Sequence, residues 1–333
     1  MKSQKGILIM INKSYKKEFK NIKEEIDKAK NILFLTHRAP DGDAIGSVLA
    51  LNLYLKKQKK NTYIYILGAP RFLNFLPYFE EIKTKSPKHQ DFDLIFSLDY
   101  AGEERLEKPF HFFLDKRKII SIDHHPEGKI IGKIKLILPF VSSTSEILYY
   151  LLDSIKAKID KNIATCLLAG ILTDTGGFSF ASQNSERVVG KLLKEGAELS
   201  KIMERYNSFS LSRARILAKM ISRIKRDEDF EMLWSWLSFD DFKREKERSF
   251  LQEPPIFPDF LSRIDKAKVY LFMIEYKNGR VKGSLRSRQG VDVSKISQSL
   301  GGGGHKSASG FKTTGTIKEV LEKVKRELKK ELK

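Results

Sequence analysis

One imidazole and two carboxylates lie within seven residues of one another, at His37, Asp41 and Asp43. They follow a short apolar run, residues 32–36, that has the composition of a buried strand. A strand that ends in a turn carrying His and Asp offers imidazole and oxygen ligands to a divalent cation. The Pro-Asp-Gly sequence inside this segment is also an ordinary turn signal, so the segment alone leaves a metal site and a plain turn equally open.

The same arrangement recurs at three further places in the chain. Asp99, the triplet Asp123-His124-His125 and Asp174 each follow an apolar segment. Taken singly, each is explained as a helix cap, a turn residue or a surface histidine. Chance alone is a poor explanation for four such segments. Segments of this kind end at one edge of a parallel sheet, so their polar residues would lie together there. We therefore expect a shared site.

The residue types of this site favour a pair of metal ions. Carboxylates and imidazoles without cysteine favour Mn²⁺ or a similar first-row ion over a structural zinc site. Two cations about 3.5–4 Å apart can activate a water molecule and hold the phosphoryl oxygens of an in-line displacement. Aspartate suits this chemistry because one carboxylate can contact both cations. The four segments therefore predict a two-metal centre for phosphoester hydrolysis.

The elements that must position these residues alternate between strand and helix from residue 20 to about residue 180. This alternation is typical of a parallel sheet that is covered on both faces and binds ligands at the carboxyl ends of its strands. The spacing of apolar residues predicts strands at 32–36, 62–67, 94–98 and 118–122, and helices at 21–30, 44–55, 142–152 and 161–172.

The pattern changes after residue 185. The next elements are predicted as helices at 185–196, 199–207 and 211–226, a loop at 254–258, and strands at 231–237, 269–275 and 280–285. Asn278-Gly279 is the expected hairpin turn between the last two strands. Thr316 and Glu319 form a capping box for a final helix. We expect an α/β protein with a parallel-sheet domain at 20–215 and a smaller α/β substrate-binding domain at 230–333, joined by a helical linker.

Composition limits the partners and the compartment. The net charge of +20, from 62 Lys and Arg against 42 Asp and Glu, favours a polyanionic partner, although a lysine-rich background would give the same excess. No apolar run approaches the roughly 18 residues that span a bilayer, so we expect no membrane association. The single cysteine, Cys166, excludes an internal disulfide and fits a cytoplasmic location.

The four segments resemble the four motifs of the DHH phosphoesterase family, in the same order along the chain. The matching residues are His37-x3-Asp41-x-Asp43, the isolated Asp99, Asp123-His124-His125, and Thr173-Asp174-Thr175-Gly176. The resemblance implies one metal ion held by His37, Asp41 and Asp99. It implies a second ion held by Asp43, Asp99, His124 and Asp174, with Asp99 between the two.

The resemblance also implies catalytic roles for two residues beside the metal ligands. His125 would contact the phosphate as a charge stabiliser or as a proton donor to the leaving oxygen. Asp123 would orient a histidine by a hydrogen bond. Arg105, six residues after Asp99, either reaches the substrate or lies on a helix surface.

The second domain narrows the resemblance to one branch of the family. Arginines bind phosphate in a bidentate manner, and glycines let backbone N–H groups approach an anion closely. The residues concerned are Arg286, Ser287 and Arg288, at the end of a predicted strand, and Gly302, Gly303, Gly304 and His305. They resemble the C-terminal DHH-associated domain, and Ser143-Thr144-Ser145-Glu146 is similar to the nano-RNase and pAp-phosphatase branch. The simpler explanations are an exposed strand edge for the arginines and a flexible linker for the glycines.

The function implied is a manganese-dependent hydrolase that cleaves very short RNA to mononucleotides and 3′-phosphoadenosine 5′-phosphate (pAp) to AMP. Its expected partners are short single-stranded RNA, pAp or small dinucleotides, and a homodimer is compatible with the resemblance. Hydrolysis of cyclic dinucleotides, or of their linear products, remains open. A non-catalytic nucleic-acid-binding module is the alternative from a different class. The complete set of ligand-type residues argues against that module.

Overall fold

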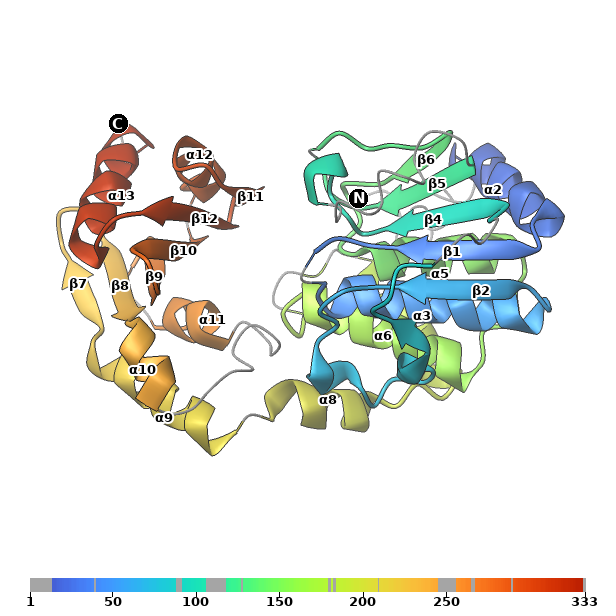
Figure 1. The fold of residues 1–333 in the computed structure, drawn as a ribbon, viewed down its shortest axis with the longest axis horizontal. Coiled ribbons are helices and arrows are strands. Elements are labelled where there is room, and N and C mark those ends of the chain that lie inside the picture. The colour runs from blue at the N-terminus through green and yellow to red at the C-terminus, as the bar shows by residue number, and fades with distance from the viewer. Residues whose placement is uncertain are drawn as a thin grey trace. The chain divides into compact units, whose positions relative to one another are not determined.

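The structure is a computed structural model that describes residues 14–38, 40–87, 92–105, 118–126, 128–178, 181, 184–208, 210–244, 256–264, 267–288 and 290–331. The chain divides into two compact units, Met1–Ser208 and Phe209–Lys333. Each unit is built around one six-stranded sheet (Figure 1). Within the described ranges, no helix is both long and apolar enough to cross a membrane.

The N-terminal unit alternates strands and helices as its sequence predicts. In chain order its elements are α2 (Lys16–Lys28), β1 (Asn31–Leu35), α3 (Gly42–Lys57), β2 (Asn61–Tyr65), η1 (Arg71–Leu73), η2 (Phe79–Glu81), β3 (Ile82–Lys83), β4 (Leu94–Leu98), η3 (Glu103–Arg105), β5 (Lys118–Asp123), β6 (Ile134–Ile137), α5 (Thr144–Ser154), α6 (Lys161–Asp174), α7 (Ser185–Lys194) and α8 (Leu199–Asn207).

The N-terminal sheet has the strand order β3-β2-β1-β4-β5-β6, and every neighbouring pair is parallel. The predicted parallel sheet is therefore confirmed. Since parallel strands all end at the same edge, the carboxyl ends of β1, β4 and β5 lie beside one another (Figure 1). This is the edge at which an α/β sheet binds its ligands.

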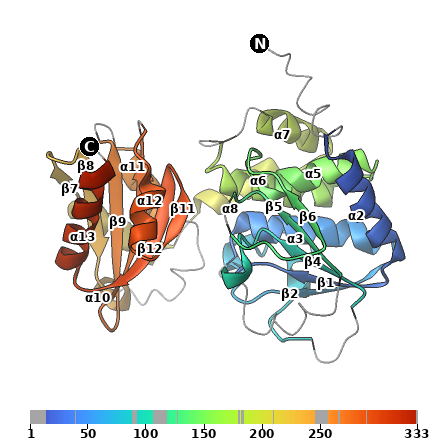
Figure 2. The ribbon, with the colours of Figure 1, turned by 90° about the horizontal axis from the view of Figure 1, so that it is seen from above.

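Both faces of this sheet are covered because its central strands are apolar throughout. All five residues of β4 are buried. The larger core cluster joins one face to α3, α5 and α6, which Figure 2 shows on the same side of the sheet. A smaller cluster, which includes Leu33, Ile95 and Tyr100, lies on the opposite face.

Helices α3 and α6 approach each other closely at two glycines. A Cβ atom on Gly46 of α3 would lie 2.5 Å from the carbonyl oxygen of Cys166. On α6, a Cβ atom on Gly170 would lie 1.9 Å from the Ser145 hydroxyl and 2.9 Å from an Asp43 carboxylate oxygen. The missing side chain at Gly170 therefore leaves room for polar groups at the start of α3 and α5.

The C-terminal unit contains a mixed sheet. Its elements are α9 (Leu211–Ser222), β7 (Lys225–Asp227), β8 (Met232–Leu237), α10 (Phe239–Arg244), α11 (Ile256–Ser262), β9 (Val269–Tyr276), β10 (Arg280–Ser287), α12 (Val293–Ser299), β11 (Gly303–His305), β12 (Ala308–Thr314) and α13 (Ile317–Glu331). The strand order is β11-β12-β10-β9-β8-β7, and only β8 and β9 pair in parallel. One core cluster contains residues of α12 and α13, and another contains residues of α9 and α11.

Two predictions for this unit were wrong in part. The helix expected at 211–226 ends at Ser222, because residues 225–227 pair with β8 as a short antiparallel strand. The loop expected at 254–258 includes the start of α11 at Ile256, whereas Pro254 and Pro255 lie outside the described residues. Phe257 and Leu261 of α11 are buried against the sheet, and this tertiary packing outweighs the local proline signal.

The capping box before the last helix is confirmed. The Thr316 backbone N–H donates to the Glu319 carboxylate at 2.8 Å, and the Glu319 N–H donates to the Thr316 hydroxyl at 3.2 Å. Each side chain thus satisfies a backbone donor that the first turn of a helix leaves without a partner.

Candidate functional site

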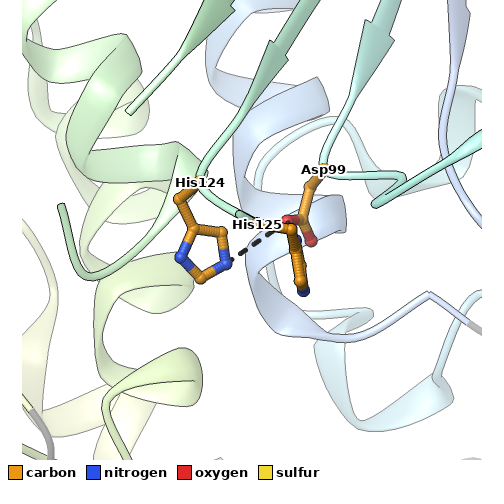
Figure 3. Close-up of side chains that lie close together, drawn as sticks. All are labelled: Asp99, His124 and His125. Carbon is orange, nitrogen blue, oxygen red and sulfur yellow. Dashed lines mark ion pairs between the residues drawn. The ribbon is translucent and has the colours of Figure 1, made fainter. Parts of the chain in front are cut away.

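The carboxyl ends of the central parallel strands place five of the expected site residues together. His37 follows β1 closely, Asp99 follows β4 directly, and β5 ends in Asp123 followed by His124. Figure 3 shows the Asp99 carboxylate close to the rings of His124 and His125. The nearest nitrogens of these two rings lie 3.7 and 3.5 Å from Asp99 Oδ1. His37 Nε2 lies 3.9 Å from the other oxygen, so Asp99 is the centre of the group.

Two helices supply the remaining carboxylates. Asp41 caps the amino terminus of α3, and its Oδ1 accepts hydrogen bonds from the N–H groups of Asp43 and Ala44 at 3.0 and 3.1 Å. Asp43 lies in the first turn of the same helix. Asp174 is the last residue of α6, and its Oδ2 lies 3.3 Å from His124 Nε2. Asp41 therefore caps α3 and also lies close enough to His37 and Asp99 to share a metal ion with them.

Three overlapping groups of these side chains have the spacing to hold a metal ion. In each group the ligand atoms all lie within 4.8 Å of one another. The groups are His37, Asp41 and Asp99; Asp43, His124 and Asp174; and Asp99, His124 and His125. All six residues expected as metal ligands belong to at least one group, and Asp99 and His124 each belong to two.

The electrostatics of the group fit a bound cation. Burial, and then the charge of Asp41, raises the pKa of Asp43 to about 7. Burial followed by the neighbouring carboxylates also raises the pKa values of Asp99 and Asp174. Asp43 and Asp99 are at most 1% exposed, so water cannot screen their repulsion. A divalent cation would compensate these charges, and the mixed imidazole and carboxylate donors suit such an ion.

The protonation of His37 also suits a metal ligand. Its Nδ1 lies 2.7 Å from the Arg38 carbonyl oxygen, and with the proton on Nδ1 the ring donates to this oxygen and keeps the Nε2 lone pair on the side of Asp99. Burial lowers the pKa of His37, and the nearby Arg105 charge contributes to the decrease. A guanidinium nitrogen of Arg105 lies 3.2 Å from His37 Nδ1, so this arginine stands beside the site.

Asp123 holds the end of β4 as well as His125. Its carboxylate accepts hydrogen bonds from the N–H groups of Tyr100 and Ala101, at 2.9 and 2.8 Å, and from Nδ1 of His125 at 2.8 Å. Asp99 and Ala101 both have left-handed backbone conformations, with φ of 51° and 59°. Burial opposes ionisation of Asp123, but hydrogen bonds from His125 outweigh it and hold the pKa at about 2. Asp123 thus fixes the strained turn that presents Asp99.

The start of α5 supplies contacts to the site that the sequence does not predict. Thr144 and Ser145 donate backbone N–H groups to the two Asp43 oxygens, at 2.6 and 2.9 Å. The Thr144 hydroxyl donates to Asp99 Oδ1 at 3.1 Å. Residues 143–146 stand out in the sequence only through the family resemblance, and Ser143 is the N-cap of α5, whose hydroxyl accepts the Glu146 N–H at 3.0 Å. A cap predicts where a helix starts, but it does not predict that the first turn of this helix contacts Asp43 and Asp99.

The expected substrate-binding residues of the C-terminal unit lie together at one end of adjacent strands. Arg286 of β10 and His305 of β11 are both paired with Ala308 of β12, one on each side. The glycine-rich residues Gly302, Gly303 and Gly304 lead into this position, where a Cβ atom on Gly302 would lie 2.1 Å from the Gly310 carbonyl oxygen.

The two residues after Arg286 have further contacts in the same unit. The Ser287 hydroxyl donates to the Val291 carbonyl at 2.6 Å. The guanidinium of Arg288 donates to the Ser262 carbonyl at 2.7 Å and lies over the Tyr270 ring. These contacts tie the end of β10 to α11 and to the loop that precedes α12.

Comparisons with known proteins agree with this arrangement. Residues 31–171 match the family model described as DHH family, N-terminal domain, and residues 253–333 match the DHHA1 domain. The chain is 32% identical to the bifunctional oligoribonuclease and PAP phosphatase NrnA of Thermus thermophilus, over 89% of this chain and 90% of the relative. It is 24% identical to the cyclic-di-AMP phosphodiesterase GdpP of Bacillus subtilis, over 91% of this chain and 48% of that protein.

A solved structure has the same fold over nearly its whole length. The crystal structure of an exopolyphosphatase-related protein from Bacteroides fragilis superposes with a TM-score of 0.87, at 26% identity. The match covers 95% of this chain and 96% of the other.

Proposed function

Because the chain belongs to the DHH family, we propose that it is a phosphoesterase that hydrolyses very short RNA to mononucleotides and pAp to AMP. The observation that carries this proposal is the convergence of seven histidines and aspartates, whose ligand atoms form overlapping groups within 4.8 Å. The relative from Thermus thermophilus, which is named for both activities, supports the choice of substrates. We further propose a cytoplasmic location. We also propose a homodimer, which light scattering of the purified protein would test.

We assign two divalent cations, with Mn²⁺ as the preferred ion. His37, Asp41 and Asp99 would hold one ion. Asp43, His124 and Asp174 would hold the other together with Asp99, which lies 3.7 Å from His124, so that Asp99 would serve both. When bound, such cations lower the pKa of water and compensate the charge of the phosphate. The donor set contains no thiolate, which favours Mn²⁺ over structural Zn²⁺.

The protein's own groups would then act on the phosphate. Asp123 fixes the His125 ring through Nδ1, so that Nε2 is the nitrogen available to stabilise the phosphate or to donate a proton to the leaving oxygen. In the C-terminal unit we assign substrate phosphates to Arg286, Ser287 and Arg288, and to Gly302, Gly303, Gly304 and His305. Guanidinium groups and close backbone N–H groups match the oxygens of a phosphate.

Hydrolysis of a cyclic dinucleotide, or of its linear product, is the second candidate. The similarity to a cyclic-di-AMP phosphodiesterase over 91% of this chain favours it. The chain spans only about half of that relative, so the likeness concerns its corresponding part alone.

A substrate panel tests these proposals. Purified protein is given dinucleotide RNA, a long RNA, pAp and cyclic dinucleotides, with Mn²⁺ or with a chelator. We expect Mn²⁺-dependent turnover of dinucleotide RNA and pAp, and slow or no turnover of the long RNA. Equal rates on long and dinucleotide RNA would contradict the short-substrate proposal. Binding without turnover of any substrate would favour the non-catalytic module.

A further inference from the structure

Two lysines of the C-terminal sheet lie directly opposite each other. Lys282 of β10 and Lys312 of β12 are partners in the antiparallel register. Lys282 is half-buried and Lys312 is exposed. Among the described residues, no carboxylate lies within 4.0 Å of either ammonium group. Like charges placed directly across a strand pair destabilise the sheet. A bound anion would offset the repulsion between these two ammonium groups.

A third cation, Arg286, shares the sheet face of Lys282. Side chains alternate along β10, and Val281 and Leu285 are buried on the opposite face against the core that includes α12 and α13. Lys282 and Arg286 therefore point to the other face. Burial, then the charges of Lys312 and Arg286, lowers the pKa of Lys282. The neighbouring strands β10 and β12 (Figure 1) thus carry three cations on the face that also packs against α9 and α11, and Lys312 is the exposed one of the two lysines.

We propose that Lys282 and Lys312 bind phosphate groups of an oligoribonucleotide and extend the phosphate-binding surface that begins at Arg286. This inference rests on the proposed function, because it takes short RNA as the substrate. Lys282 and Arg286 are four residues apart on one strand, which places them about 13 Å apart along it. A chain with several phosphates therefore suits these two positions better than a single phosphate does.

This geometry favours RNA longer than a dinucleotide over pAp, whose phosphates belong to one nucleoside. Lysine is a point charge on a flexible stem, so it attracts the phosphate chain without selecting its sequence. We therefore expect affinity to increase with the number of nucleotides until the surface is filled.

The experiment measures binding of a fluorescent RNA tetranucleotide by anisotropy, in chelator, at several salt concentrations. Wild type is compared with Lys312→Gln, with the double variant Lys282→Gln/Lys312→Gln, and with Lys318→Gln. Lys318 is exposed at the start of α13 and makes a matched control for the removal of charge. For single-stranded RNA, each phosphate that is no longer neutralised by a lysine should reduce the slope of log K against log salt by about 0.7.

We expect weaker binding and a smaller salt slope for Lys312→Gln and more so for the double variant, while Lys318→Gln behaves as wild type. Because Lys312→Gln removes a repulsion between like charges, its melting temperature should equal or exceed that of wild type, which separates a binding defect from misfolding. The decrease in turnover should also be larger for tetranucleotide RNA than for pAp.

Two outcomes separate this inference from the proposed function. If the wild type hydrolyses RNA but both lysine variants bind it with unchanged affinity and salt slope, the proposed lysine surface is refuted and the proposed function is not. If the wild type binds RNA through these lysines but hydrolyses neither RNA nor pAp, the surface stands and the proposed function fails.

Discussion

The hydroxyl of Thr144 donates a hydrogen bond to the Asp99 carboxylate at 3.1 Å, in a fully buried position. The backbone N–H of Thr144 donates at the same time to Asp43, at 2.6 Å. One residue at the start of α5 therefore connects the carboxylate that follows β4 with the carboxylate in the first turn of α3. Residues that orient metal ligands in this way control how well the ligands bind the metal.

Thr144→Val should weaken metal binding, because it removes the hydroxyl while keeping the shape of the side chain. Substitutions of this kind typically reduce metal affinity by about 10- to 100-fold. Isothermal titration with Mn²⁺ measures the affinity, and Thr144→Ser, which keeps a hydroxyl, should restore most of it. Unchanged Mn²⁺ affinity in a folded Thr144→Val protein would show that Asp99 needs no such support.

Asp99→Asn should abolish hydrolysis, because Asp99 is the carboxylate common to two ligand groups. Steady-state kinetics with dinucleotide RNA and Mn²⁺ measure the effect, and circular dichroism verifies the fold. Normal Mn²⁺-dependent turnover in this variant would contradict the assignment of Asp99 to both cations.

Arg288→Ala should raise KM and leave kcat less affected, because Arg288 is assigned to substrate binding rather than to the chemical step. The same substrate and metal are used for the comparison. Since the Arg288 guanidinium also contacts the Ser262 carbonyl, a melting curve is needed to separate a binding defect from a loosened α11. A fall in kcat with an unchanged KM would contradict this role.

Asp123→Asn should reduce both stability and kcat. The carboxylate holds the N–H groups of Tyr100 and Ala101 and the ring of His125, and loss of a buried hydrogen bond to a charged group lowers stability by about 1.5–3 kcal/mol. The pKa of Asp123 is about 2, below its ordinary value of 3.8, so its stabilising effect is present above pH 3.8 and is lost as the pH falls towards 2.

Urea unfolding at pH 7 and at pH 3 tests this expectation. The difference in unfolding free energy between wild type and Asp123→Asn should be larger at pH 7. An equal difference at both pH values would mean that the charge of Asp123 does not stabilise the fold.

The metal-free protein should lose stability as the pH rises from about 4 to about 7. The pKa of Asp43 is raised from 3.8 to about 7, so over this range the folded protein holds a proton that the unfolded chain has released. Melting temperatures of the chelator-treated protein measure the loss. Asp43→Asn should lose less stability over the same range, and Mn²⁺ should stabilise wild type more at pH 7 than at pH 5.

The parallel sheet could be predicted because its signals are local. The strand at 94–98 is an unbroken apolar run, as expected of a strand buried on both faces, and the observed β4 has the same bounds. β6 and β12 were not predicted, since they contain Lys135 and Lys312 and are stabilised by pairing with distant strands. For the same reason residues 225–227, which continue a helical pattern, form a strand beside β8.

By itself, the sequence determined which groups could do the chemistry, because residue type and order along the chain define the ligands. It also determined that the residues after β1, β4 and β5 would converge, since strands of a parallel sheet end at one edge, whereas Asp41, Asp43 and Asp174 are brought there by α3 and α6. Only the tertiary structure decided how these groups are held. Thr144 meets Asp43 across 101 residues of chain, and the pairing of Lys282 with Lys312 depends on strand register. Both contacts depend on packing between distant segments, which no local pattern in the sequence encodes.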